Sequence, residues 1–275
     1  KAVALNIPYY HSLCGNDIQD RALLRYEIYL RTYMLNMLRI NSPYAFTAFG
    51  SAIACRIKDY NAIGGFDGQT AGEDFYFLQK MVKYGNLKLY TDTHVYPSSR
   101  ISERVLYGTG TAIADFQNNN FNRYPIFHFS SFDVIAETYQ RMHEIFNKDI
   151  VSEFIEFLNY NSIEQDLWGK LRTNYKTLPL FTKAFHQKID GLRLFQFLRN
   201  RQIAINKTDE ICLQDYLTAF YPLKFFDMNP ISFDISTIDK LQSIRNFLAN
   251  EEDSWRNKQD FRIFEKKRVI LPNEI

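Results

Sequence analysis

The sequence predicts a mixed α/β region up to about residue 130, followed by a mostly α-helical region. Two patterns support this prediction. Strand-like and helical segments alternate in residues 1–130, whereas residues 131–275 show helical spacing of apolar residues and few strand signals. Apolar residues make up 46% of the 275 residues, which is enough to bury a sizeable core.

The elements of the first region follow from local signals. Asn16 is a candidate N-cap, and helical spacing of apolar residues continues from there to about Ile40. Small and apolar residues in 44–57 indicate one or two strands, with Gly50 inside them as a site of bulging or close backbone approach. Later segments are expected as a helical turn at 59–63, a helix from Gly72 to Tyr84, short strands at 87–91 and 94–96, and a helix near Thr111 capped by Thr109.

The second region is predicted to be a series of helices. The segments with helical periodicity are 133–147, 149–160, 162–174, 178–200, 211–220 and 236–250. The charged tail from Glu251 to Lys267 is expected to be a solvated helix or an extended arm.

Composition and charge exclude several classes of function. A net charge of +2 gives no electrostatic basis for binding nucleic acid. No apolar run reaches the roughly 18 residues of a transmembrane span. The three cysteines, Cys14, Cys55 and Cys212, show neither metal-ligand spacing nor a disulfide framework, so a reducing, cytoplasmic compartment is expected. The chain begins at Lys1, and we expect it to be part of a longer protein.

Glu73 and Asp74 follow a glycine-rich turn and open a predicted helix. One interpretation is structural, because Thr70 and Glu73 have capping-box spacing and Asp74 is favoured by the helix dipole. The other is functional, because a carboxylate at a helix N-terminus stays ionised and can accept a hydroxyl proton as a general base. The two interpretations are compatible.

A basic run follows the last predicted strand of the first region. Arg100 and Arg104 could hold a phosphate through bidentate bonds, or could pair with Glu103 or Asp92, or lie in water. Residues 108–111, Gly-Thr-Gly-Thr, resemble a fragment of a phosphate loop without its lysine, but a plain turn is the better explanation of them.

These motifs together resemble one known family. The ordered stretches 50–56 (Gly-Ser-Ala-Ile-Ala-Cys-Arg), 60–67 (ending Gly-Gly-Phe-Asp) and 72–78 (Gly-Glu-Asp-Phe-Tyr-Phe-Leu) are similar to the acceptor-side half of family 2 glycosyltransferases. Residues 96–110 look like a subgroup of uncharacterised bacterial members. The resemblance covers residues 1 to about 120, and 131–275 are similar to that subgroup's C-terminal extension only loosely.

The resemblance implies a GT-A fold in residues 1–130 and inverting transfer of a sugar from a nucleotide-diphosphate donor to a hydroxyl acceptor. Carried over to this chain, it makes Asp74 the general base, with Glu73 as neighbour or alternate. It places Gly50 and Ser51 near the donor sugar or diphosphate, and makes Arg100 and Arg104 candidates for holding the leaving diphosphate.

The family's Asp-x-Asp metal motif and its N-terminal nucleotide-binding half do not occur in this sequence. The nucleotide-sugar donor and a divalent metal, Mg²⁺ or Mn²⁺, are therefore expected only in the full-length protein. The alternative is a non-catalytic helical module that binds an acceptor, a partner protein or a membrane surface at the inner face of the membrane. That alternative rests on the aromatic and basic segment from Phe185 to Arg201.

Overall fold

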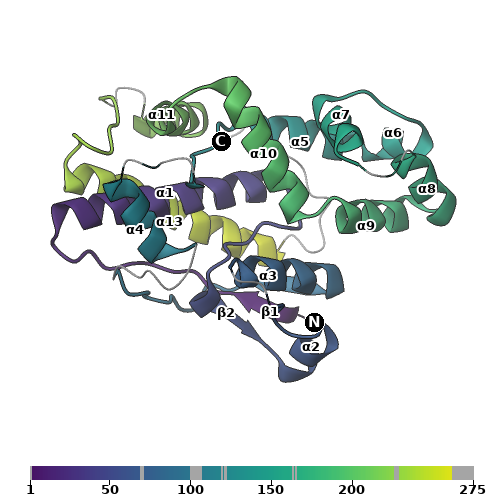
Figure 1. Cartoon of the computed structure of the whole chain (residues 1–275), viewed down its shortest axis with the longest axis horizontal. Coiled ribbons are helices and arrows are strands. Elements are labelled where there is room, and N and C mark those ends of the chain that lie inside the picture. Colours follow the sequence, from purple (N-terminus) through teal and green to yellow (C-terminus); the bar gives the residue numbers. More distant parts are fainter. Residues whose placement is uncertain are drawn as a thin grey trace.

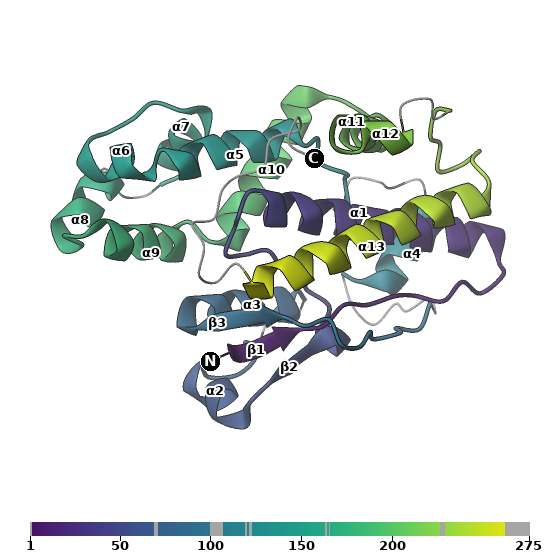
Figure 2. The same cartoon turned by 180° about the vertical axis from the view of Figure 1, so that it is seen from behind.

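The computed structural model describes residues 2–68, 71–99, 107–118, 120, 123–162, 164, 166–225 and 229–261. A small sheet lies with two helices at one side of the molecule, and the long helices α1 (Asp17–Arg39) and α13 (Ile238–Phe261) lie side by side through its middle (Figure 1, Figure 2). The predicted mixed α/β class with a helical C-terminal part is confirmed. Among these described residues, no helix is long and apolar enough to span a bilayer.

The sheet has three short strands in the order β2-β1-β3. Strand β1 (Ala2–Asn6) is central; it pairs antiparallel with β2 (Ile53–Cys55) and parallel with β3 (Asn86–Leu89). The sequence did not predict β1. The expected strands at 44–57 shrink to β2, because residues 50–52 form a 3-10 turn (η1, Gly50–Ala52) instead. The expected strand at 94–96 is a single bridge between Tyr9 and Val95.

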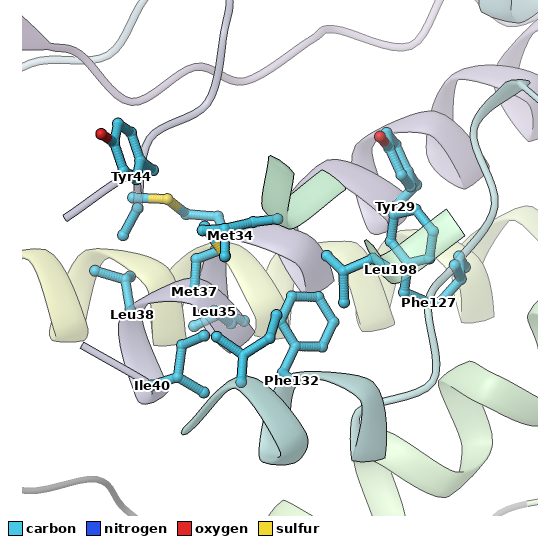
Figure 3. Close-up of a cluster of buried hydrophobic side chains, with 14 of the residues drawn as sticks. Tyr29, Met34, Leu35, Met37, Leu38, Ile40, Tyr44, Phe127, Phe132 and Leu198 are labelled. Carbon is cyan, nitrogen blue, oxygen red and sulfur yellow. The ribbon is translucent and has the colours of Figure 1, made fainter. Parts of the chain in front are cut away.

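Helix α1 (Asp17–Arg39) begins as predicted. The side chain of Asn16 accepts a hydrogen bond from the main-chain N–H of Gln19 at 3.1 Å, which satisfies one of the helix's unpaired donors. Its apolar side chains extend into the main core, where Tyr29, Met34, Leu35 and Leu38 meet side chains from the helical region (Figure 3). The structure therefore buries α1 on most of its surface.

Two helices flank the sheet, α2 (Ile57–Ala62) and α3 (Glu73–Tyr84). The Gly-Gly-Phe motif joins them for a steric reason. Gly65 has φ +67°, and a Cβ there would lie 2.7 Å from the Tyr60 ring, so only glycine fits. Phe66 stacks on Phe77 of α3 with ring centroids 4.3 Å apart, which packs the turn against α3.

The helical region follows the predicted periodicity, with two divisions that were not expected. The predicted segment 133–147 forms two helices that meet at Arg141. The predicted segment 178–200 is two helices, because Asp190 caps a new helix by accepting a hydrogen bond from the main-chain N–H of Arg193. The helices are α4 (Thr109–Gln117), α5 (Ser130–Gln140), α6 (Met142–Asn147), α7 (Glu153–Tyr160), α8 (Leu167–Asn174), α9 (Leu178–Lys188), α10 (Gly191–Ile205), α11 (Asp209–Phe220), α12 (Pro222–Phe225) and α13 (Ile238–Phe261).

The prediction of a solvated tail after Glu251 is wrong for residues 251–256. These residues continue α13, which lies along α1, and the side chains of Glu252 and Arg256 are completely buried. One hydrophobic core extends from α1 through α5 to α13, so the proposed boundary at residue 130 does not separate two cores.

A buried ionic network explains why charged residues occupy this helix. Arg31 of α1 bonds Glu252 at 3.0 Å, and Arg256 bonds the same carboxylate at 2.7 Å. Arg245 bonds Glu27 of α1 at 3.0 Å. All five side chains are at most 2% exposed. The network thus joins α1 and α13 through paired charges, the condition under which buried ions are tolerated.

The same arginines donate hydrogen bonds to the segment that leads out of β1, from Asn6 to His11. Arg256 donates to the main-chain oxygen of Asn6 at 2.9 Å, Arg31 donates to that of Tyr9 at 2.6 Å, and Arg245 donates to that of His11 at 3.1 Å. The central strand is therefore attached to both long helices.

We predict that Arg256→Met destabilises the protein by roughly 3–5 kcal/mol, because it removes one of two arginines paired with the buried Glu252 carboxylate. It also removes a donor to the Asn6 carbonyl, which keeps the main-chain N–H of Tyr90. Urea unfolding monitored by circular dichroism measures this difference. Lys207→Met is the matched control: it breaks an ion pair with Asp215 that is exposed to solvent, so its effect on the free energy of unfolding should be much smaller. Equal effects of the two substitutions would contradict the assignment.

A second prediction concerns the loss of folding stability at low pH. Burial alone would raise the pKa of Glu27, but the hydrogen bond from His11 and the charges of Arg31 and Arg245 outweigh it and lower the pKa from 4.5 to about 2. Ionised Glu27 therefore contributes about 3 kcal/mol of stability above its unfolded pKa, which is lost as the pH falls through the folded value.

In Glu27→Gln, the free energy of unfolding should be lower at neutral pH and should lose much of its slope between about pH 4.5 and pH 2. Urea titrations at several pH values measure the slope. Glu156→Gln, which removes an exposed carboxylate on α7, should keep the wild-type slope. An unchanged slope in Glu27→Gln would show that other carboxylates cause the acid transition.

Candidate functional site

The structure brings Asp74 and Gly50 together, although they lie 24 positions apart in the sequence. Asp74 lies in the first turn of α3, and Gly50 opens the 3-10 turn before β2. A Cβ added to Gly50 would lie 3.8 Å from Asp74 Oδ2, and the Gly50 main-chain N–H donates a hydrogen bond to the Asp74 carboxylate. Two of the predicted site residues therefore form one local constellation.

The other predicted residues are placed less closely. Ser51 follows Gly50 and is exposed, and Glu73 is exposed at the start of α3. Each lies next in sequence to a member of the constellation, with no hydrogen bond between them among the described contacts. Arg100 and Arg104 lie outside the described residues.

The expected capping box is not the arrangement at the start of α3. The N-cap is Gly72, in the left-handed region with φ +76°, and it makes no side-chain capping bond. Thr70, the expected cap, lies outside the described residues. Because the left-handed Gly72 is the N-cap, Asp74 is not part of a side-chain capping interaction at the start of α3. Its Oδ1 instead accepts the main-chain N–H of Phe75 at 2.8 Å.

The environment of Asp74 raises its pKa above the ordinary value of 3.8. Partial burial is the largest cause, and the negative charge of Glu73 adds to it. The hydrogen bonds from Phe75 and Gly50 oppose the rise without cancelling it. A half-buried carboxylate with a raised pKa, beside the exposed Gly50 and Ser51, is suited to accept a proton from an approaching hydroxyl.

Sequence reasoning missed the aromatic residues that support this site. Phe49, directly before Gly50, stacks on Tyr9 with ring centroids 5.2 Å apart. It also meets His11 edge-on at 5.4 Å. The available signal was the position of Tyr9, Tyr10 and His11 just after the apolar run 2–7, because functional residues often lie in loops held by a rigid scaffold.

The glycine-threonine turn is also corrected. Thr109 was expected to cap a helix starting near Thr111, but α4 begins at Thr109 itself, and its N-cap is Gly108 with φ +113°. The Thr109 hydroxyl instead lies 2.9 Å from His11 Nε2.

The described side chains offer no cluster of three or more His, Cys, Asp or Glu residues that could hold a metal ion. His94 Nε2 lies 3.0 Å from Asp253 Oδ2. Comparison of the chain with protein-family models, with curated proteins and with solved structures gave no match. The glycosyltransferase resemblance therefore remains a prediction from the motifs, and the site is interpreted from its own geometry.

Proposed function

We propose that this chain supplies the acceptor side of an inverting glycosyltransferase, with Asp74 as the general base. The observation that carries the proposal is the contact between Gly50 and Asp74. Two motifs that occur in the family's order, glycine-small and glycine-acid-acid, meet in space and leave one carboxylate beside open backbone. A purely capping role for the acid pair would not require this meeting.

In the proposed reaction, the acceptor hydroxyl attacks the anomeric carbon of a nucleotide-diphosphate sugar. A new C–O bond forms on one face as the bond to the diphosphate breaks on the other, and the hydroxyl proton passes to the Asp74 carboxylate. Gly50 has no side chain, so substrate can approach the carboxylate there. Arg100 and Arg104 are the proposed partners of the leaving diphosphate. No step is assigned to a metal, because the described residues do not fit one.

The alternative, a non-catalytic module in the helical region, receives less support. The apolar side chains of the segment from Phe185 to Arg201 face the core, with Phe185, Phe197 and Leu198 at most 1% exposed. The basic side chains Lys188 and Arg201 pair with Glu164 and Glu153. The two helices of this segment, α9 and α10, therefore pack their apolar faces inside the protein and do not present them to a membrane.

We predict that Asp74→Asn in the full-length protein lowers sugar transfer by about 10²–10⁴-fold, because a general base is lost while the shape of the side chain is kept. Release of nucleoside diphosphate from a panel of nucleotide sugars measures transfer. Glu73→Gln, at the exposed neighbouring position, is the control and should retain most activity. Undiminished transfer by Asp74→Asn would remove the base assignment, whereas absence of transfer by the wild-type protein would favour the helical-module alternative.

The pH dependence of transfer gives a separate prediction. Asp74 must be ionised to accept a proton, and its pKa is raised, so the rate should fall with decreasing pH around a value above 3.8. Glu73→Gln removes a charge that raises this pKa, and should move the acidic limb to lower pH. A limb that does not move in this variant would show that another group controls it.

A further inference from the structure

An acid, a histidine and a hydroxyl form a continuous chain of contacts beside the candidate site. Glu27 Oε1 lies 2.5 Å from His11 Nδ1, and His11 Nε2 lies 2.9 Å from Thr109 Oγ. The three residues come from α1, the segment after β1, and the start of α4. This order of contacts is that of the catalytic triads, which are recognised by geometry and roles and not by sequence position.

The surroundings of Glu27 and His11 determine which ring nitrogen of His11 carries the proton. Glu27 and His11 are completely buried. The Glu27 carboxylate also accepts the His11 main-chain N–H at 2.7 Å and bonds Arg245 at 3.0 Å, so it is held ionised and immobile. An ionised acceptor at Nδ1 keeps the proton on that nitrogen. Nε2 of the neutral ring is then left as an acceptor for the Thr109 hydroxyl proton.

Thr109 is the member that a substrate can reach, because it is only partly buried while its partners are buried completely. It is the first residue of α4, a helix of nine residues. The first N–H groups of an α-helix have no acceptor within the helix's own hydrogen-bond ladder. The positive end of the helix and these donors can stabilise negative charge developing next to Thr109 Oγ.

We propose that Thr109 Oγ is an activated nucleophile that accepts an acyl group from an ester or thioester. The threonine oxygen forms a bond to the acyl carbonyl carbon, and its proton passes to His11 Nε2. The bond from carbon to the alcohol or thiol then breaks, and the leaving group takes the proton from His11. Water attacks the acyl-threonine by the same route, which regenerates the hydroxyl and releases the acid.

This activity would be distinct from sugar transfer. Asp74 takes no part in it, and the ring of Phe49, which directly precedes Gly50, meets His11 edge-on. A purely structural role for His11 predicts the same hydrogen bonds but no reactivity at Thr109. Covalent labelling therefore separates the two explanations.

The test is reaction of the purified chain with an alkyl fluorophosphonate, which bonds to activated hydroxyl oxygens and releases fluoride. Peptide mass spectrometry should find the adduct on Thr109. Thr109→Val should abolish it, Thr109→Ser should retain it, and His11→Gln should slow it by about 10²–10⁴-fold, the usual contribution of a general base. Thr218→Val, which removes an exposed hydroxyl of α11, is the matched control and should label like the wild type.

Absence of an adduct, or an adduct on another residue that persists in Thr109→Val, would overturn the proposal. Circular dichroism checks that each variant is folded. If His11→Gln is unfolded, the comparison of Thr109→Val with Thr109→Ser decides alone, because these changes alter one atom group at a partly exposed helix start. Asp74→Asn should label normally, so failure here leaves the sugar-transfer proposal unaffected.

Discussion

The contact between α1 and α13 through paired buried charges is the constraint on which the rest of the structure depends. Arginines of both helices donate to main-chain oxygens of the segment from Asn6 to His11. This segment leads out of the central strand and carries Tyr9 and His11, against which Phe49 packs. Since Phe49 precedes Gly50, the charged network in the helical layer determines where the candidate site lies.

The site itself is built from short-range features that need this support. A left-handed glycine starts α3, a 3-10 turn carries Gly50, and the Phe66–Phe77 stack fixes the intervening turn. Each of these features involves only a few residues. Together they bring a main-chain donor to a carboxylate whose burial would otherwise be unfavourable, which is how a carboxylate can be held with an altered pKa in a folded protein.

The sequence predicted what depends on local chemistry and failed where distant residues decide. Asn16 marks the start of α1, and periodicity identifies most of the helical region. The sequence also identifies Glu73, Asp74 and Gly50 as candidate site residues, but it does not predict the contact between Gly50 and Asp74. By contrast, the charges of residues 251–256 indicate a solvated surface to any local rule, and only their partners on α1 explain their burial. The His11–Thr109 contact joins residues 98 positions apart and has no local signature.

The bond between Arg256 and Asn6 has a consequence for synthesis of the protein. These residues are 250 positions apart, so the N-terminal strand leaves the ribosome long before its charged partner exists. Until α13 emerges, Glu27 and Arg31 lack their ion-pair partners on that helix. The main-chain oxygens of Asn6 and His11 also lack their arginine donors from α13. Non-local closure of this kind slows folding and leaves intermediates exposed, which makes the nascent chain a natural client for chaperones.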